Sequence, residues 1–148
     1  MVLADAISYV VKNYKPKKLI DVATLTGACI VALGYDYSGL ISNNESLAKK
    51  ILDLAVKTDD RAWLLPSYPE IKEAVKSQIA DIRNLGWPKG AAGTLTAAEF
   101  LRQFTNDIPW VHLDIAGTAF AEDKGRMYFG YGATGAGVRL LTAYLQGS

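Results

Sequence analysis

The sequence has very few of the residues that usually mark disulfide, zinc or thiol chemistry. It contains one cysteine, Cys29, and one histidine, His112. A single cysteine cannot form an internal disulfide or a cysteine zinc site. Cys29 lies in the apolar run ACIVALG, and free cysteine is among the residue types most often buried. We therefore expect Cys29 to be a core residue in a protein of a reducing compartment.

Long apolar runs and an excess of either charge are also missing. No segment approaches about 18 consecutive apolar residues, so the sequence predicts no membrane span. No basic region and cleavage site follow Met1, so no signal peptide is expected. Sixteen basic and fifteen acidic residues leave a formal charge of +1, which does not indicate a nucleic-acid surface. We expect a cytoplasmic protein with neither a nucleic-acid nor a membrane partner.

What is present is typical of one globular α/β unit over residues 1–148. Half of the residues are hydrophobic and 21% are charged. Helical periodicity and short, nearly all-apolar β-rich runs alternate along the chain, which indicates a sheet covered on both faces. Helices are expected over 2–14, 26–34, 45–57, 94–104 and 138–145, with a weak one over 71–77, and strands over 18–24, 37–43, 63–65 and 110–117. The glycine-rich stretch 125–137 is expected to be irregular.

The first helix has no recognisable beginning. Helices normally open on Ser, Thr, Asp or Asn, which satisfies their unpaired N–H groups. Here apolar periodicity is already under way at Met1. We expect the sequence to start inside an element.

WVHLDIAGTA, residues 110–119, holds the only histidine two places before an acid. On a strand His112 and Asp114 point to the same face, so they are candidates for a catalytic or metal-binding pair. A metal site needs further ligands at suitable spacing, and a hydrolytic triad needs a nucleophile such as the serine of GxSxG. Neither pattern is present, and the other acids are expected mainly on the solvent faces of helices. We interpret His112 as a buried, hydrogen-bonded structural residue.

Two glycine clusters, GWPKGAAG at 86–93 and GYGATGAG at 130–137, each precede an expected helix. Backbone N–H groups at such places can hold anions, so a nucleotide-binding domain is one hypothesis. Neither cluster matches GxxxxGK[ST]. Tight loops are the alternative interpretation.

In DVATLTGA, residues 21–28, two threonines and a glycine lie where an expected strand ends. In open α/β sheets ligands bind beyond the carboxyl ends of the strands, and backbone groups there can pair with an extended peptide. A simple strand-to-helix turn capped by Thr24 or Thr26 explains the same residues. The pattern alone leaves both interpretations open.

Taken together, six stretches resemble the C-terminal part of the catalytic domain of the leucyl (cytosol) aminopeptidases, the M17 metallopeptidases. They occur in the family's order and cover nearly the whole chain. The stretches are VLADAI at 2–7, IDVATLTGACIVALG at 20–34, IADIRNLG at 79–86, AAGTLTAAEFL at 91–101, WVHLDIAGTA at 110–119 and GATGAGVRLL at 132–140.

This resemblance implies a mixed, mostly parallel sheet sandwiched between helices. It also implies hydrolysis of the first peptide bond of a substrate with a free N-terminus, by a water that two divalent ions, Zn or Mn, activate. In the family, backbone groups of the ATLTG turn hold the substrate. Small apolar positions line the pocket for a leucine-like first side chain, and a further position lines the pocket for the second. The corresponding substrate-binding candidates are Thr24, Leu25, Gly27, Leu85, Ala116 and Ala119.

The resemblance implies an absence as well. The family's metal ligands and its catalytic lysine and arginine all precede the VLADA helix, and the last of them lie in an NTDAEGR motif that ends just before the position of Met1. We therefore expect no catalytic or metal-binding residue in these 148 residues, no bound metal ion, and no activity of the segment alone. Like the hexameric family, it is expected to form a homo-oligomer. The alternative is a non-catalytic binding or assembly module derived from the same fold.

Overall fold

The computed structural model describes residues 1–122 and 130–147. Its centre is a four-stranded sheet in the order β1-β4-β2-β3. The strands are β1 (Leu19–Ala23), β2 (Ser38–Ser42), β3 (Ala62–Leu64) and β4 (Trp110–Asp114). β4 pairs in parallel with β1 and antiparallel with β2, and β2 pairs in parallel with β3. The sheet is therefore mixed and mostly parallel, as the family resemblance implies.

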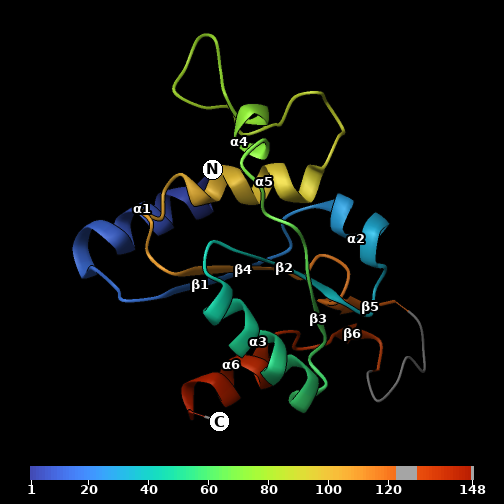
Figure 1. The fold of residues 1–148 in the computed structure, drawn as a ribbon. Helices are drawn as coiled ribbons and strands as arrows, with labels where there is room; N and C mark the ends of the chain where they lie inside the picture. Colours follow the sequence, from blue (N-terminus) through green and yellow to red (C-terminus); the bar gives the residue numbers. More distant parts are fainter. Residues whose placement is uncertain (123–129, 148) are drawn as a thin grey trace.

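Helices cover both faces of this sheet (Figure 1). On one face lie α1 (Val2–Tyr14), α2 (Gly27–Leu33), α4 (Ile71–Ala74) and α5 (Gly93–Arg102). On the other face α3 (Glu45–Thr58) packs beside α6 (Val138–Leu145). A two-stranded sheet, β5 (Phe120–Ala121) with β6 (Gly132–Ala133), lies beyond the end of β4.

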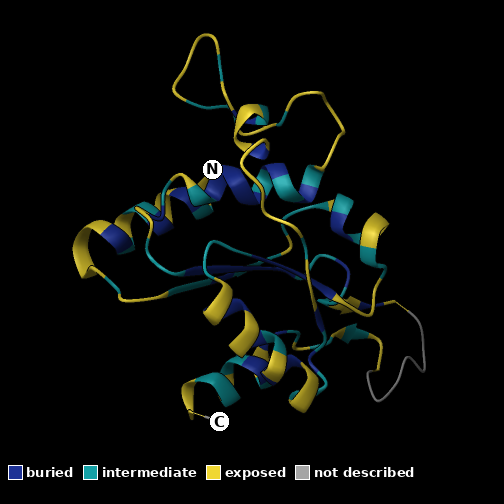
Figure 2. Cartoon of the chain, viewed as in Figure 1, coloured by how far each residue is buried: buried dark blue, intermediate teal, exposed yellow. Residues whose placement is uncertain are grey.

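Strand β4 is buried along its whole length and separates two apolar cores. Val111 and Leu113 join the core under α3 and α6. Trp110 joins the core under α1 and α5. Side chains of a strand alternate between faces, so His112 and Asp114 share the face of Trp110. Figure 2 shows this strand and its neighbours as the buried centre of the molecule.

Local capping explains where two of the helices begin. The Asn44 side chain accepts the N–H of Leu47 at the start of α3 (2.8 Å). The Thr26 hydroxyl accepts the N–H of Cys29 at the start of α2 (3.2 Å). Gly34 ends α2 with a φ of 68°, a backbone conformation that favours glycine. In α1 no side chain caps the first turn.

The expected elements all occur, with shifted ends. β4 ends at Asp114 and not at Gly117, because the chain turns there: the amides of Thr118 and Ala119 donate to the carbonyl of Ile115 (3.1 and 2.9 Å). The region expected to be irregular contains strand β6, and its residues 125–129 lie outside the described part of the chain. Within the described residues, no helix combines the length and the apolar character that crossing a bilayer requires.

Candidate functional site

The carboxyl ends of the parallel strands β1 and β4 meet at one edge of the sheet, and Asp114 connects the turns that follow them. Its Oδ1 accepts the N–H of Leu25 in the β1–α2 turn and the N–H of Ala116 in the turn after β4, both at 3.1 Å. Its Oδ2 accepts the hydroxyl of Thr26 at 2.7 Å. Asp114 is fully buried. Hydrogen bonds to a buried carboxylate are strong, so this side chain determines how both turns are held.

Thr26 extends the same network into the next layer. Its oxygen lies 2.9 Å from the hydroxyl oxygen of Thr94 in α5, while its capping bond orients α2. The turn at the end of β1 is therefore fixed from three sides, by β4, by α2 and by α5. Of the two capping candidates in the sequence, the structure selects Thr26.

His112 has a different partner from Asp114. Its Nδ1 lies 2.6 Å from Oδ1 of Asp21 in β1, and Oδ2 of Asp21 accepts the indole N–H of Trp110 at 2.5 Å. The histidine is fully buried and its ring stacks on Trp110 with centroids 6.3 Å apart. The interpretation of His112 as a buried, hydrogen-bonded residue is confirmed for Nδ1, whereas Nε2 has no hydrogen-bond partner among the described residues.

Asp21 is the residue that the sequence analysis missed. It was grouped with acids expected mainly on solvent faces, but it is buried in a sheet strand. The sequence contains a sign of this burial, because a charged residue inside the apolar run LIDVA needs a buried partner. The sequence does not show which residue that partner is.

An apolar pocket of about 450 Å³ lies next to the β1–α2 turn. Leu25 and Leu85, two of the predicted substrate-binding residues, both line it although 60 positions separate them in the sequence. The walls come from the start of α1, the turn, the loop before α5, and α5 itself. The other described lining residues are Met1, Leu3, Thr26, Asn84, Gly86, Lys89, Gly90, Ala91, Gly93, Thr96, Ala97, Phe100 and Leu101.

The other four predicted substrate-binding residues lie outside this pocket. Thr24 and Gly27 are exposed in and after the turn, and a Cβ added at Gly27 would meet nothing within 4 Å. Ala116 follows β4, and its N–H shares Asp114 Oδ1 with that of Leu25. Ala119 lies further along, where its carbonyl accepts the N–H of Thr134 next to β6 (3.1 Å). The structure thus groups Leu25 with Leu85 and with Ala116, and leaves Ala119 apart.

The two glycine clusters have different environments. Gly86, Gly90 and Gly93 line the apolar pocket. At the start of α6 the amide of Gly137 donates to Asp60 Oδ1 (3.0 Å) and that of Leu140 to Oδ2 (3.3 Å). The carboxylate of Asp60 therefore already occupies the place where an anion would bind at this helix end.

The side chains of the described residues do not fit a metal centre. No group of three or more His, Cys, Asp and Glu side chains in residues 1–122 and 130–147 is arranged to hold an ion. The buried carboxylates of Asp21 and Asp114 are bound by donors of the protein itself. Burial, together with a smaller effect of the Asp114 charge, raises the pKa of the nearby Cys29 thiol to about 11, so this thiol is protonated at neutral pH.

In this mixed α/β sheet, turns follow the carboxyl ends of the parallel strands β1 and β4. Many α/β proteins bind their ligands at that edge of the sheet, and this defines the class of the protein. Comparison with known proteins specifies the class. The model of the cytosol aminopeptidase family, catalytic domain, matches residues 1–142. This chain belongs to the cytosol aminopeptidase family.

Similar proteins from different organisms support this family assignment. A probable cytosol aminopeptidase of Cenarchaeum symbiosum (strain A) is 50% identical over 149 residues, which are 99% of this chain and 30% of the relative. One of Pseudomonas syringae pv. tomato is 51% identical over 148 residues, 98% of this chain and 28% of the relative. The solved structure of a tomato leucine aminopeptidase mutant matches with a TM-score of 0.88 and 37% identity, over 99% of this chain and 27% of that one. The chain therefore spans somewhat less than a third of the length of these relatives.

Proposed function

We propose that these residues form the C-terminal part of a leucyl-aminopeptidase catalytic domain and supply the walls that hold a peptide substrate. The observation that carries this proposal is the β1–α2 turn, which the buried carboxylate of Asp114 holds beside an apolar pocket. Membership of the cytosol aminopeptidase family supplies the class of reaction. The substrate would be a peptide with a free N-terminus and a leucine-like first residue.

In this proposal the turn pairs with the substrate as a neighbouring strand would. The backbone of Thr24, Leu25 and Gly27 faces the extended N-terminal residues of the peptide, a mode of recognition that uses main-chain hydrogen bonds. Ala116 and Ala119 limit the space for the first side chain, and Leu85 contacts the second. Burial of the substrate's apolar side chains against these small, apolar residues contributes most of the binding energy.

The reactive centre would lie in protein outside these residues. The described carboxylates offer no ligand set for two divalent ions, Zn or Mn, and the relatives are more than three times as long as the matched region. We accordingly propose that residues 1–148, as one unit, bind substrate and do not hydrolyse it when isolated.

The test is reconstitution. The purified chain is assayed for metal-dependent release of leucine from a leucyl chromogenic substrate. It is then assayed as a chimera in which it replaces the matched 30% of the Cenarchaeum symbiosum relative. We expect no turnover by the chain alone and turnover by the chimera. Activity of the isolated chain would contradict the proposal, and so would a folded, metal-loaded chimera that is inactive.

Assembly without hydrolysis is the second candidate, and exposed apolar side chains favour it. Val31 on α2 is 89% exposed and Val2 on α1 is 83% exposed, and exposed apolar patches often mark contacts between proteins. A homo-oligomer, hexameric as in the family, in the cytoplasm is the form proposed. Light scattering that finds only monomer would count against assembly by this chain.

A further inference from the structure

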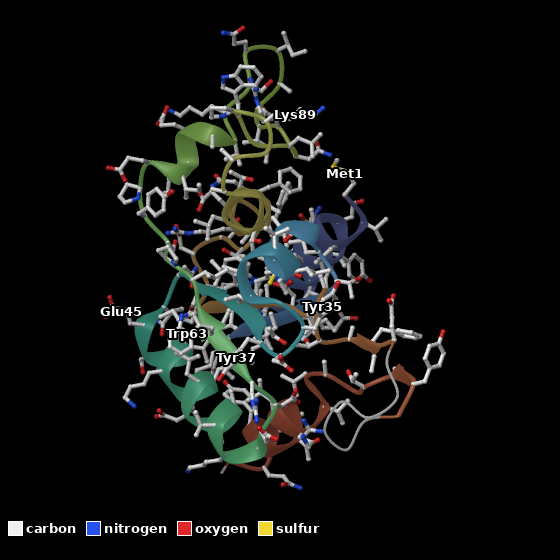
Figure 3. All side chains as sticks on the ribbon, turned by 90° about the vertical axis from the view of Figure 1, so that its right-hand side faces the viewer. Met1, Tyr35, Tyr37, Glu45, Trp63 and Lys89 are labelled. Atoms are coloured by element: carbon white, nitrogen blue, oxygen red, sulfur yellow. The ribbon has the colours of Figure 1, made fainter. Side chains whose placement is uncertain are left out.

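The apolar pocket beside the β1–α2 turn has one charged side chain among its described lining residues, that of Lys89. Lys89 lies on the exposed loop that precedes α5. Figure 3 labels it in the upper part of the molecule, as it does Met1, which also lines the pocket. No carboxylate within the described residues forms an ion pair with Lys89. Its ammonium group is available to a ligand.

The other polar side chains of the pocket are mostly committed to the protein. The hydroxyl of Thr26 donates to Asp114, and the hydroxyl of Thr96 donates to the carbonyl of Gly93 at 3.1 Å. Asn84 and Lys89 are left to recognise a polar group. A pocket with leucine and phenylalanine walls and one positively charged side chain in its lining fits an apolar side chain next to an anion.

We propose that Lys89 binds the α-carboxylate of a dipeptide whose apolar second side chain enters this pocket. The inference rests on the proposed function, which places the first residue of the substrate along the turn at Leu25. The second side chain then reaches the pocket that Leu25 and Leu85 line. In a dipeptide the carboxylate is attached to the same Cα as that side chain, so it lies at the mouth of the pocket, within reach of the long lysine side chain. A longer peptide or a C-terminal amide carries no charge at this point.

The expected effect is small. An exposed ion pair stabilises by a few tenths to one kcal/mol, which corresponds to a preference of about two- to fivefold. Salt screens such a pair, so the preference should weaken as ionic strength rises. The apolar contacts of the second side chain are the same in the acid and in the amide, and they cancel in the comparison.

The experiment titrates the 148-residue chain, labelled with ¹⁵N, with leucyl-leucine, leucyl-leucinamide and leucyl-glutamic α-amide, and measures Kd from the shifts of backbone amides. The glutamic amide carries its carboxylate on the side chain. The variants are Lys89→Gln, which removes the charge, and Lys89→Arg, which keeps it. Lys57→Gln is the matched control, because Lys57 is an exposed lysine on α3, at the opposite face of the sheet.

We expect leucyl-leucine to bind about two- to fivefold more tightly than its amide, with the preference lost in Lys89→Gln and kept in Lys89→Arg and Lys57→Gln. Equal affinity for acid and amide, no binding of either, or a preference that survives Lys89→Gln would overturn the proposal. Tight binding of the glutamic amide would overturn the choice of the α-carboxylate. Because the readout is binding, a failed reconstitution of hydrolysis would leave this result unaffected.

Discussion

The hydroxyl of Thr26 donates to the buried carboxylate of Asp114 at 2.7 Å, across 88 positions of sequence. This bond, with those from the amides of Leu25 and Ala116, joins the ends of β1 and β4 into one rigid edge. The proposed substrate-binding turn thus depends on an aspartate that need not touch the substrate.

Replacing Asp114 with Asn should loosen this edge. One amide group cannot accept all three donors, and the loss of charge-assisted bonds costs about 2 kcal/mol. For a chain of this size that lowers Tm by about 4–8 °C. Thermal unfolding followed by circular dichroism measures the change. Asp107→Asn is the control, because Asp107 is exposed, and it should leave Tm within about 1 °C. Equal Tm values for the two variants would show that Asp114 does not hold the turns.

Asp21 accepts from both His112 and Trp110, so two substitutions can separate its contributions. Asp21→Asn retains one acceptor oxygen, whereas Asp21→Ala leaves the buried donors of both rings unpaired. Each unpaired donor costs about 1–3 kcal/mol, so the alanine variant should be the less stable of the two by about that amount. Urea unfolding followed by tryptophan fluorescence gives both values. An alanine variant as stable as the asparagine variant would contradict the shared role of this carboxylate.

Gly117 and Gly27 make a matched pair of glycines. A Cβ at Gly117 would overlap the carbonyl oxygen of Gly34, whereas one at Gly27 would meet nothing within 4 Å. Gly117→Ala must move backbone and should cost about 2 kcal/mol or more, while Gly27→Ala in α2 should be neutral or slightly stabilising. The free energy of unfolding of each variant in urea tests this.

Gly27→Ala also separates folding from substrate binding. If Gly27 lies beside the substrate, its alanine variant should fold normally but raise KM in the reconstituted chimera. An unchanged KM would remove Gly27 from the substrate-binding residues without affecting the fold.

Cys29 should resist alkylation while the chain is folded. At pH 9 a thiol with the ordinary pKa of 9.0 is half ionised, and one with a pKa of about 11 is ionised to about 1%. Only the thiolate reacts, so iodoacetamide should label the native chain about fiftyfold more slowly than the chain in urea, and burial slows it further. Labelling followed by mass spectrometry measures both rates, and equal rates would contradict the burial of Cys29.

The same raised pKa makes stability depend on pH in a defined direction. The protonated thiol is favoured in the folded state, so its contribution is complete below pH 9 and is lost as the pH rises towards about 11. Wild type should therefore lose stability faster than Cys29→Ala across that range. Parallel pH profiles of the two chains would argue against a raised pKa.

The sequence by itself determined the order of the elements, the burial of Cys29 and His112, and the family. These properties follow from local patterns, namely apolar periodicity, turn residues and short sequence motifs, each of which involves only neighbouring positions. The tertiary structure decided the partners of the buried charges and the composition of the pocket. His112 pairs with Asp21 across 91 positions and Leu25 with Asp114 across 89. Such contacts depend on which strands lie adjacent and in which register, and this is set by the packing of the whole sheet between its two helical layers.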